Sequence, residues 1–272
     1  MSTKPKAILI NGLLTTAALT AAFPLLWMLS VSLMPAGAST QLPPPLVPSE
    51  PTLTHYQHLF SQGGLTRAFG NSLLLATLAT LLSVAFNTLA GYAFAKLRFR
   101  GRERLFALLL GALVIPGQVG MLPLFLMLKQ MGLVNTWAGV LLPGLASIFG
   151  IFLVRQYARG IPDELLEAAR MDGAGEARIF LTVVLPLLKP VLVTLAVFAF
   201  LGSWNDFMWP LIVLTDGDLH TLPVLLAALS REHVQDVELM MAGAVITVLP
   251  VLLLFLALQR YYMQGLLMGA VK

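Results

Sequence analysis

The chain has 272 residues, of which 58% are hydrophobic and only 11% are charged. Soluble domains carry roughly 25% charged residues, so this composition excludes an ordinary water-soluble globular protein. The absence of cysteine excludes disulfide frameworks and cysteine-ligated metal sites, and the four histidines show no paired spacing typical of a metal site. The mean hydropathy of +0.85 indicates instead that lipid surrounds much of the chain.

Apolar runs of about 20 residues, the length that crosses roughly 30 Å of hydrocarbon, occur repeatedly along the chain. They predict an all-α, polytopic membrane protein with six transmembrane helices, at approximately residues 8–34, 72–95, 105–128, 137–154, 183–202 and 242–258. The first run exceeds the core of a signal peptide, so we expect it to be retained as a span. No linker or short-period repeat marks a second domain, so residues 1–272 are expected to form one transmembrane domain.

Positive charge is concentrated in alternate connections. With the N-terminus inside, the four inner segments hold two, five, five and two Lys or Arg residues, which is 14 of the 17, and only Arg67, Lys129 and Arg231 lie outside. Because Lys and Arg are retained on the cytoplasmic side during insertion, this asymmetry predicts cytoplasmic N- and C-termini. It also explains the net charge of +4 without a nucleic-acid partner, and we expect none.

The long inner connection, residues 155–182, contains a short amphipathic segment. Pro162 is pre-set for a first helical turn, Asp163 and Glu164 place carboxylates at the positive end of the helix dipole, and Asp172-Gly173 is typical of a stop and turn. At 100° per residue, one face carries Asp163, Glu164, Glu167 and Arg170 and the other carries Leu165, Leu166, Ala168 and Ala169. Three acids to one arginine favour docking into a protein groove over resting on lipid headgroups.

At this point the sequence resembles a known family. Glu167-Ala168-Ala169 is followed after three residues by Gly173, and after nine more by Val183-Val184-Leu185-Pro186. This order, between the fourth and fifth expected spans, is similar to the EAA loop of ABC importer permease subunits, with Val183 where isoleucine is usual. Trp204-Asn205-Asp206-Phe207 and the chain end, 259–272, resemble the carbohydrate-uptake branch, in particular the smaller permease subunit of maltose transporters. The resemblance covers nearly the whole chain and implies the type I ABC importer permease fold.

The resemblance implies a transport subunit of a bacterial or archaeal inner membrane, not an enzyme, with no cofactor and no metal. The implied partners are two copies of a cytoplasmic ATPase subunit, a second homologous permease, an external substrate-binding protein, a small-molecule sugar and membrane lipid. The ATPase would be separate, since the sequence has no G-x-x-x-x-G-K-[ST] loop. The implied ATPase-coupling residues are Glu167, Ala168, Ala169, Asp172, Gly173, Ala174, Leu185 and Pro186.

Within such a loop each residue type has an implied role. Glu167 would pair with a basic residue of the ATPase, Gly173 would permit a sharp turn, and Ala168 and Ala169 would be small because the groove is tight. The tail over 265–272 resembles one that reaches between ATPase subunits, although a frayed terminus is the alternative. Outside, residues 216–238 would meet the binding protein with an acidic surface formed by Asp216, Asp218, Glu232, Asp236 and Glu238.

Four polar or aromatic side chains are candidates for the translocation path: Trp204, Asn205 and Asp206 at the outer end of the fifth span, and Asn87 in the second. Aromatic faces stack on sugar C–H patches, while amides and carboxylates bond sugar hydroxyls. The structural alternatives stay open, because a boundary tryptophan can anchor the interface, Asp206 can cap a helix and Asn87 can cross-link helices.

Other functions compete with a disaccharide or oligosaccharide importer. Glycerol phosphate or another polyol is an alternative substrate within the same branch. An ion-coupled secondary transporter would need intramembrane carboxylates, but the six expected spans contain no Asp or Glu. A membrane hydrolase would need a nucleophile with a base or a metal pair, and the spans contain neither histidine nor cysteine.

Overall fold

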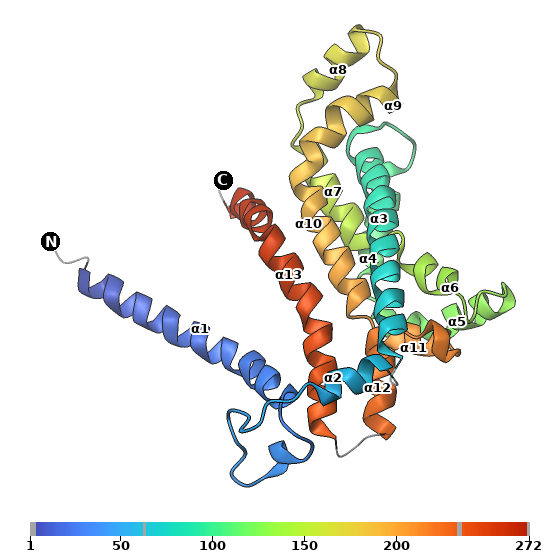
Figure 1. The fold of residues 1–272 in the computed structure, drawn as a ribbon. Coiled ribbons are helices and arrows are strands. Elements are labelled where there is room, and N and C mark those ends of the chain that lie inside the picture. The colour runs from blue at the N-terminus through green and yellow to red at the C-terminus, as the bar shows by residue number, and fades with distance from the viewer. Residues whose placement is uncertain (1–3, 62–63, 233–235, 271–272) are drawn as a thin grey trace. The chain divides into compact units, whose positions relative to one another are not determined.

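The computed structural model describes residues 4–61, 64–232 and 236–270, and every regular element in these ranges is a helix (Figure 1). The side chains of residues 4–6, 231–232, 258 and 260–270 lie outside this description. The all-α prediction is therefore confirmed for the described residues. The chain forms two compact units, residues 1–66 with 222–253 and residues 67–221 with 254–272.

Four helical segments are long and apolar enough to cross a membrane, namely Ala7–Ser32, Leu65–Lys96, Glu176–Trp204 and Val237–Ala257. Two bent helix pairs would raise the number to six if each pair is one span. They are Arg102–Ala112 with Gly117–Gln130, bent by 95°, and Trp137–Gly144 with Ile148–Arg159, bent by 43°. These pairs occupy the places where the sequence predicted the third and fourth spans.

The third and fourth expected spans are not continuous helices, and the sequence explains both breaks. Pro116 has no amide hydrogen and disfavours helical backbone at Ile115, so the first helix ends before it. In the second pair, Ser147 adopts an extended conformation and its Oγ accepts a hydrogen bond from the Gly150 amide at 2.9 Å, which starts a new helix.

The unit formed by 1–66 and 222–253 contains α1 (Lys4–Ser32), the 3-10 helix η1 (Ala38–Thr40), α2 (Thr54–Ser61), α12 (Leu222–Glu232) and the first half of α13 (Val237–Ala270). Residues 41–53, which include five prolines, contain no helix. Glu238 is wholly buried at the start of α13, and its Oε1 accepts a hydrogen bond from the Ser39 amide at 2.8 Å. The prediction that Glu238 lies on an exposed acidic surface is therefore wrong, because its side chain is buried and its Oε1 is bound by backbone rather than by solvent.

The other unit contains the remaining helices. They are α3 (Leu65–Lys96), α4 (Arg102–Ala112), η2 (Gly117–Gly120), α5 (Met121–Gln130), α6 (Trp137–Leu141), η3 (Leu142–Gly144), α7 (Ile148–Arg159), α8 (Asp163–Met171), α9 (Glu176–Ile179), the π-helix η4 (Phe180–Val184), α10 (Leu185–Trp204), α11 (Met208–Val213) and η5 (Gly217–Leu219). With 32 residues, α3 is about 48 Å long, which exceeds the hydrocarbon thickness of a bilayer.

Helices α3 and α7 approach closely along one seam. A Cβ on Gly91 would lie 2.6 Å from the Val154 Cβ, and one on Gly150 would lie 2.8 Å from the Asn87 Cγ. The partners are four residues apart on both helices, in the same order along the chain, so α3 and α7 run parallel. Small residues at such a seam let helix backbones pack tightly in lipid.

A buried apolar cluster joins α3, α7 and α10 to the loop that contains α8. Its members include Tyr92, Val154, Leu166, Val184 and Leu188. Figure 1 shows α8 and α9 beyond the end of α10, where this loop folds back on the helices. The cluster therefore fixes the base of the loop to three long helices.

Candidate functional site

Helix α8 begins and ends where the sequence predicted. Pro162 precedes it, and it ends at Met171 with Asp172 as its C-cap. Gly173 then adopts a left-handed conformation with φ +79°. The Gly173 amide donates to the Arg170 carbonyl at 2.9 Å and the Ala174 amide to the Ala169 carbonyl at 3.0 Å, the pair of bonds that defines a Schellman cap.

The two faces of α8 differ from those expected of an isolated helix. Leu166 is buried in the cluster described above and Ala169 packs against it, so both contact their own chain. Ala168 and Glu167 are exposed, and Met171 is 88% exposed. The small side chain of Ala169 is thus explained by packing within this chain, while Ala168 is available to a partner.

Lys96, the last residue of α3, holds the start of α8. Its Nζ donates to the Ile161 carbonyl at 2.5 Å and to Asp163 Oδ1 at 2.6 Å, and its side chain is 6% exposed. The hydrogen bond from Lys96, followed by its charge, lowers the pKa of Asp163. Because Lys96 also satisfies a backbone carbonyl, α3 and α8 are joined at a fixed point.

A second connection joins the end of α8 to α9. Arg170 Nε donates to Glu176 Oε1 at 2.8 Å, and the hydroxyl of Tyr92 donates to Glu176 Oε2 at 3.1 Å. The hydrogen bond to Glu176 is the main reason that the pKa of Arg170 is raised. Both ends of the expected coupling helix are therefore linked to α3, through Lys96 and through Tyr92.

The second half of the motif leads into α10. Leu185, which is half-buried, is the C-cap of the π-helix, and its amide donates to the Phe180 carbonyl five residues back. Pro186 follows in the first turn of α10 and is exposed. Residues Glu176–Trp204 form one helical segment that runs through Pro186, so the motif continues without a break from the loop into a long helix.

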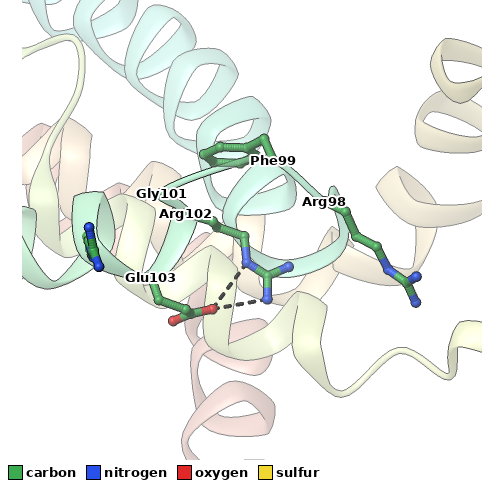
Figure 2. Close-up of a pocket in the computed structure, with 6 residues that line it drawn as sticks. Arg98, Phe99, Gly101, Arg102 and Glu103 are labelled. Carbon is green, nitrogen blue, oxygen red and sulfur yellow. Dashed lines mark hydrogen bonds and ion pairs between the residues drawn. The ribbon is translucent and has the colours of Figure 1, made fainter.

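The turn between α3 and α4 and the first turn of α4 together carry four of the five positive charges of their connection. Figure 2 shows Arg102 directed at Glu103, and the two are joined by an Nε to Oε1 hydrogen bond of 3.1 Å. Glu103 also accepts from Arg155 Nη2 at 2.9 Å, and Arg155 lies over the Phe106 ring at 3.8 Å. Arg155 Nε donates to the Phe94 carbonyl at 3.2 Å, so this buried arginine joins α7 to α3 and α4.

A cavity of about 340 Å³ lies among α3, α7 and α10. Its polar lining consists of Ser83, Ser147, Ser203 and Asp206, and Phe149 and Phe198 lie at its apolar side. The two rings pack edge to face with centroids 5.9 Å apart. Hydroxyl groups, one carboxylate and aromatic rings together suit a polar solute with apolar patches.

The predicted path residues are only partly brought together at this cavity. Asp206 lines it and also caps α11, because its Oδ1 accepts from the Trp209 amide at 3.3 Å. Asn87 is buried beside it and donates to Ser83 Oγ at 2.7 Å. Trp204 is 1% exposed and stacks on Phe200, while the Asn205 amide donates to the Leu201 carbonyl. Trp204 and Asn205 are not among the lining residues.

Several residues that position the loop were not singled out from the sequence. The sequence analysis counted Lys96 and Arg155 only among the positive charges of the inner segments. No sequence pattern singled out Tyr92 or Glu176. One sequence pattern could have indicated the pair formed by Lys96 and Asp163. Lys96 lies directly at the end of an apolar run, and Asp163 lies at the acidic start of a later helix.

Lys96→Met should loosen the start of α8. The methionine keeps the apolar stem but leaves the Ile161 carbonyl and Asp163 without the ammonium group. We expect the amides of residues 161–166 to exchange hydrogen several-fold faster, measured by mass spectrometry on the detergent-solubilised protein. Lys189→Met, at an exposed site on α10, is the control and should change nothing there. Equal exchange in both variants would show that Lys96 does not hold the loop.

Comparison with known proteins now identifies the family. Residues 87–267 match the family described as binding-protein-dependent transport system inner membrane component. The chain is 40% identical over 255 residues, 93% of this chain and 91% of the relative, to an arabinooligosaccharides transport system permease protein of Halalkalibacterium halodurans. It is 37% identical to a lactose transport system permease protein of Rhizobium radiobacter, over 78% of each chain.

A solved structure has the same fold. A chain of a bacterial ABC transporter involved in the import of the acidic polysaccharide alginate superposes with a TM-score of 0.85 at 25% identity, over 96% of this chain and 99% of that chain. The likeness to ABC importer permeases that the coupling-loop motif indicated is confirmed. The chain belongs to the family of inner membrane components of binding-protein-dependent transport systems.

Proposed function

We propose that this chain is one of two homologous permease subunits of an ABC importer for a disaccharide or oligosaccharide. It forms a single six-span transmembrane domain with both termini cytoplasmic and provides half of the translocation path. Two ATPase subunits bind on the cytoplasmic side, and an external binding protein delivers the substrate. The chain itself supplies no ATP chemistry and requires no cofactor.

The observation that carries the proposal is the construction of the loop over 161–186. Its helix is fixed at the base by Leu166 and Lys96, yet it exposes Glu167, Ala168 and Met171. A helix that is held on one side and bare on the other is suited to receive a partner and to transmit its motion. Residues 87–267, which include this loop, match the permease family, and this supports an ATPase as that partner.

The same connections describe how force would reach the spans. Closure of the ATPase pair displaces α8, and α3 follows because Lys96 and Tyr92 bind this loop. Helix α10 follows because the loop continues into it through Pro186. Rigid-body movement of packed helices then opens the path outward, and ATP hydrolysis returns it to the inward-facing state.

The substrate class rests on the cavity and on the relatives. Its three serine hydroxyls and the carboxylate of Asp206 can donate to and accept from sugar hydroxyls, and the rings of Phe149 and Phe198 can meet C–H faces. The relatives carry names for arabinooligosaccharides, lactose, and melibiose, raffinose and stachyose transport. An oligosaccharide or disaccharide is therefore the substrate that we propose for this chain.

A polyol phosphate such as glycerol phosphate is the second candidate, and the cavity disfavours it. The residues that line the cavity include one carboxylate and no Lys or Arg. In this half of the path a phosphate group would therefore be repelled by Asp206 and would find no positively charged partner. An ion-coupled secondary transporter is disfavoured by the family match.

Glu167→Lys tests the proposal. The tagged chain, co-expressed with the genes beside its own, is purified in detergent, its subunits are identified by mass spectrometry, and uptake is measured in reconstituted vesicles. We expect an ATPase to co-purify with the wild type and ATP-driven uptake to fall at least about tenfold in the variant, since reversing one member of an interfacial charge pair costs about 2 kcal/mol or more.

The charge reversal Glu50→Lys is the control, because Glu50 is exposed and lies in residues 41–53, far in sequence from the loop. It should leave uptake within about twofold of wild type, the small effect expected of an isolated surface charge. Recovery of the wild-type chain alone, active in vesicles without ATP, would contradict the proposal and indicate a secondary transporter.

A further inference from the structure

A second charged surface faces the coupling helix. A cleft of about 850 Å³ lies between the turn that follows α3 and the loop that contains α8 and α9. One wall carries Lys96, Arg98 and Arg102, and the other carries Asp163, Glu167, Arg170 and Glu176. In the function proposed above, only the second wall contacts the ATPase.

Most charges in this cleft are already paired within the chain. Lys96 binds Asp163 at 2.6 Å, Arg170 binds Glu176 at 2.8 Å, and Arg102 binds Glu103 at 3.0 Å. Among the described residues that line the cleft, Arg98 and Glu167 are the two charged side chains for which no ion pair is seen. Each acts on the cleft only through longer-range charge interactions, Arg98 with Asp163 and Glu167 with Arg170.

The two remaining charges have opposite sign and lie on opposite walls. Arg98 is exposed on the turn, and Figure 2 shows it extending away from the pair formed by Arg102 and Glu103. Glu167 is exposed on α8. An occupant that satisfies both must present a negative and a positive group at once, as a protein surface can.

We propose that the turn carrying Arg98 is a second docking contact for the ATPase subunit, which places an acidic side chain against Arg98 while a basic side chain meets Glu167. This inference rests on the proposed function, in which α8 alone contacts the ATPase. An anionic lipid headgroup fits less well, because the facing wall carries three carboxylates that would repel it.

Two ion pairs of opposite polarity would fix the orientation of the ATPase, which a single ion pair cannot do. A single ion pair fixes one point and permits rotation, whereas two pairs fix the orientation of the ATPase on the loop and reject surfaces of the wrong polarity. The second contact also acts directly on the end of α3, since Arg98 is two residues from Lys96. Movement of the ATPase then reaches α3 and α10 together.

The experiment compares Arg98→Glu with Arg100→Glu in the complete complex. Both residues are exposed on the same turn and both changes alter the charge by the same amount, but Arg100 does not line the cleft. The amount of ATPase that co-purifies with the tagged chain is measured at low and high salt, together with ATP-driven uptake in vesicles. We expect Arg98→Glu to lower ATPase recovery and uptake about tenfold, and Arg100→Glu to change either by less than about twofold.

Arg98→Gln is the second variant, in case Arg98→Glu fails to insert into the membrane. It removes the charge without reversing it, so the loss of ATPase recovery and uptake should be intermediate. Equal recovery of the ATPase and equal uptake with Arg98→Glu, Arg98→Gln and Arg100→Glu, while Glu167→Lys still lowers ATP-driven uptake, would overturn the second contact and leave the proposed function standing. No ATPase with the wild-type chain would overturn both. A loss that follows the anionic lipid content of the vesicles, with ATPase recovery unchanged, would assign Arg98 to lipid and also overturn this inference.

Discussion

Gly91→Ala is expected to destabilise the protein by about 1–3 kcal/mol, the range for an extra methyl group in a tightly packed site. The new Cβ would lie 2.6 Å from both Cβ and Cγ1 of Val154 and 3.0 Å from the Arg155 amide nitrogen. A side-chain rotation of Val154 cannot relieve the contact with the backbone of α7, so the two helices must separate. We expect a lower midpoint of thermal unfolding, measured by fluorescence in detergent.

Gly70→Ala on the same helix is the matched control. A Cβ at Gly70 would have no heavy atom within 4 Å, and alanine is the better helix former by about 1 kcal/mol. The control should therefore be as stable as the wild type or more stable. If both variants unfold at the same temperature, the seam between α3 and α7 is not as close as described.

The consequence of the Gly91 change extends to the loop that contains α8. Val154, which Gly91 contacts, belongs to the same buried cluster as Leu166 of α8. Arg155, the next residue, binds the Phe94 carbonyl and Glu103. Separation of α3 and α7 would thus weaken the base on which α8 rests, and transport should fall along with stability.

The boundaries of α8 could be predicted from the sequence because its signals are local. Pro162, the carboxylates that follow it and Gly173 act within one turn of their own positions, and the structure places the helix at Asp163–Met171. The left-handed conformation of Gly173 is local for the same reason. The first half of the family motif, Glu167 to Gly173, lies in this same short stretch.

Features that depend on distant contacts were not available to the same reasoning. The face analysis of α8 treated the helix alone, so it grouped Ala168 with Ala169, although only Ala169 packs against the buried cluster. Hydropathy is averaged over a window of residues, so it did not detect that the two bent pairs break at Pro116 and Ser147. Glu238 and Trp204 were given exposed roles, because neither the Ser39 amide nor the Phe69 ring, which packs edge to face against Trp204, is near them in sequence.

The pair of glycines that flank Ala174 gives the sharpest test of the loop itself. Gly173 has φ +79°, whereas Gly175 has φ −74° and ψ 162°, a conformation that any residue adopts. A Cβ added at either position would have no heavy atom within 4 Å, so sterics do not separate them. Gly173→Ser therefore incurs the left-handed penalty of about 1–2 kcal/mol, whereas Gly175→Ser incurs none and introduces a residue favoured before a helix.

In the assembled transporter, Gly173→Ser should reduce the amount of substrate moved per ATP hydrolysed by about fivefold or more, the factor that corresponds to about 1 kcal/mol. The variant protein should still insert into the membrane and bind substrate. The reason is that the Schellman bonds from Gly173 and Ala174 fix the end of α8, so a frayed end absorbs the displacement of the ATPase instead of passing it to α10. Gly175→Ser should couple normally. Transport per ATP that is equal in the two variants would show that the end of α8 need not be rigid, and that force passes through Lys96 and the start of the helix alone.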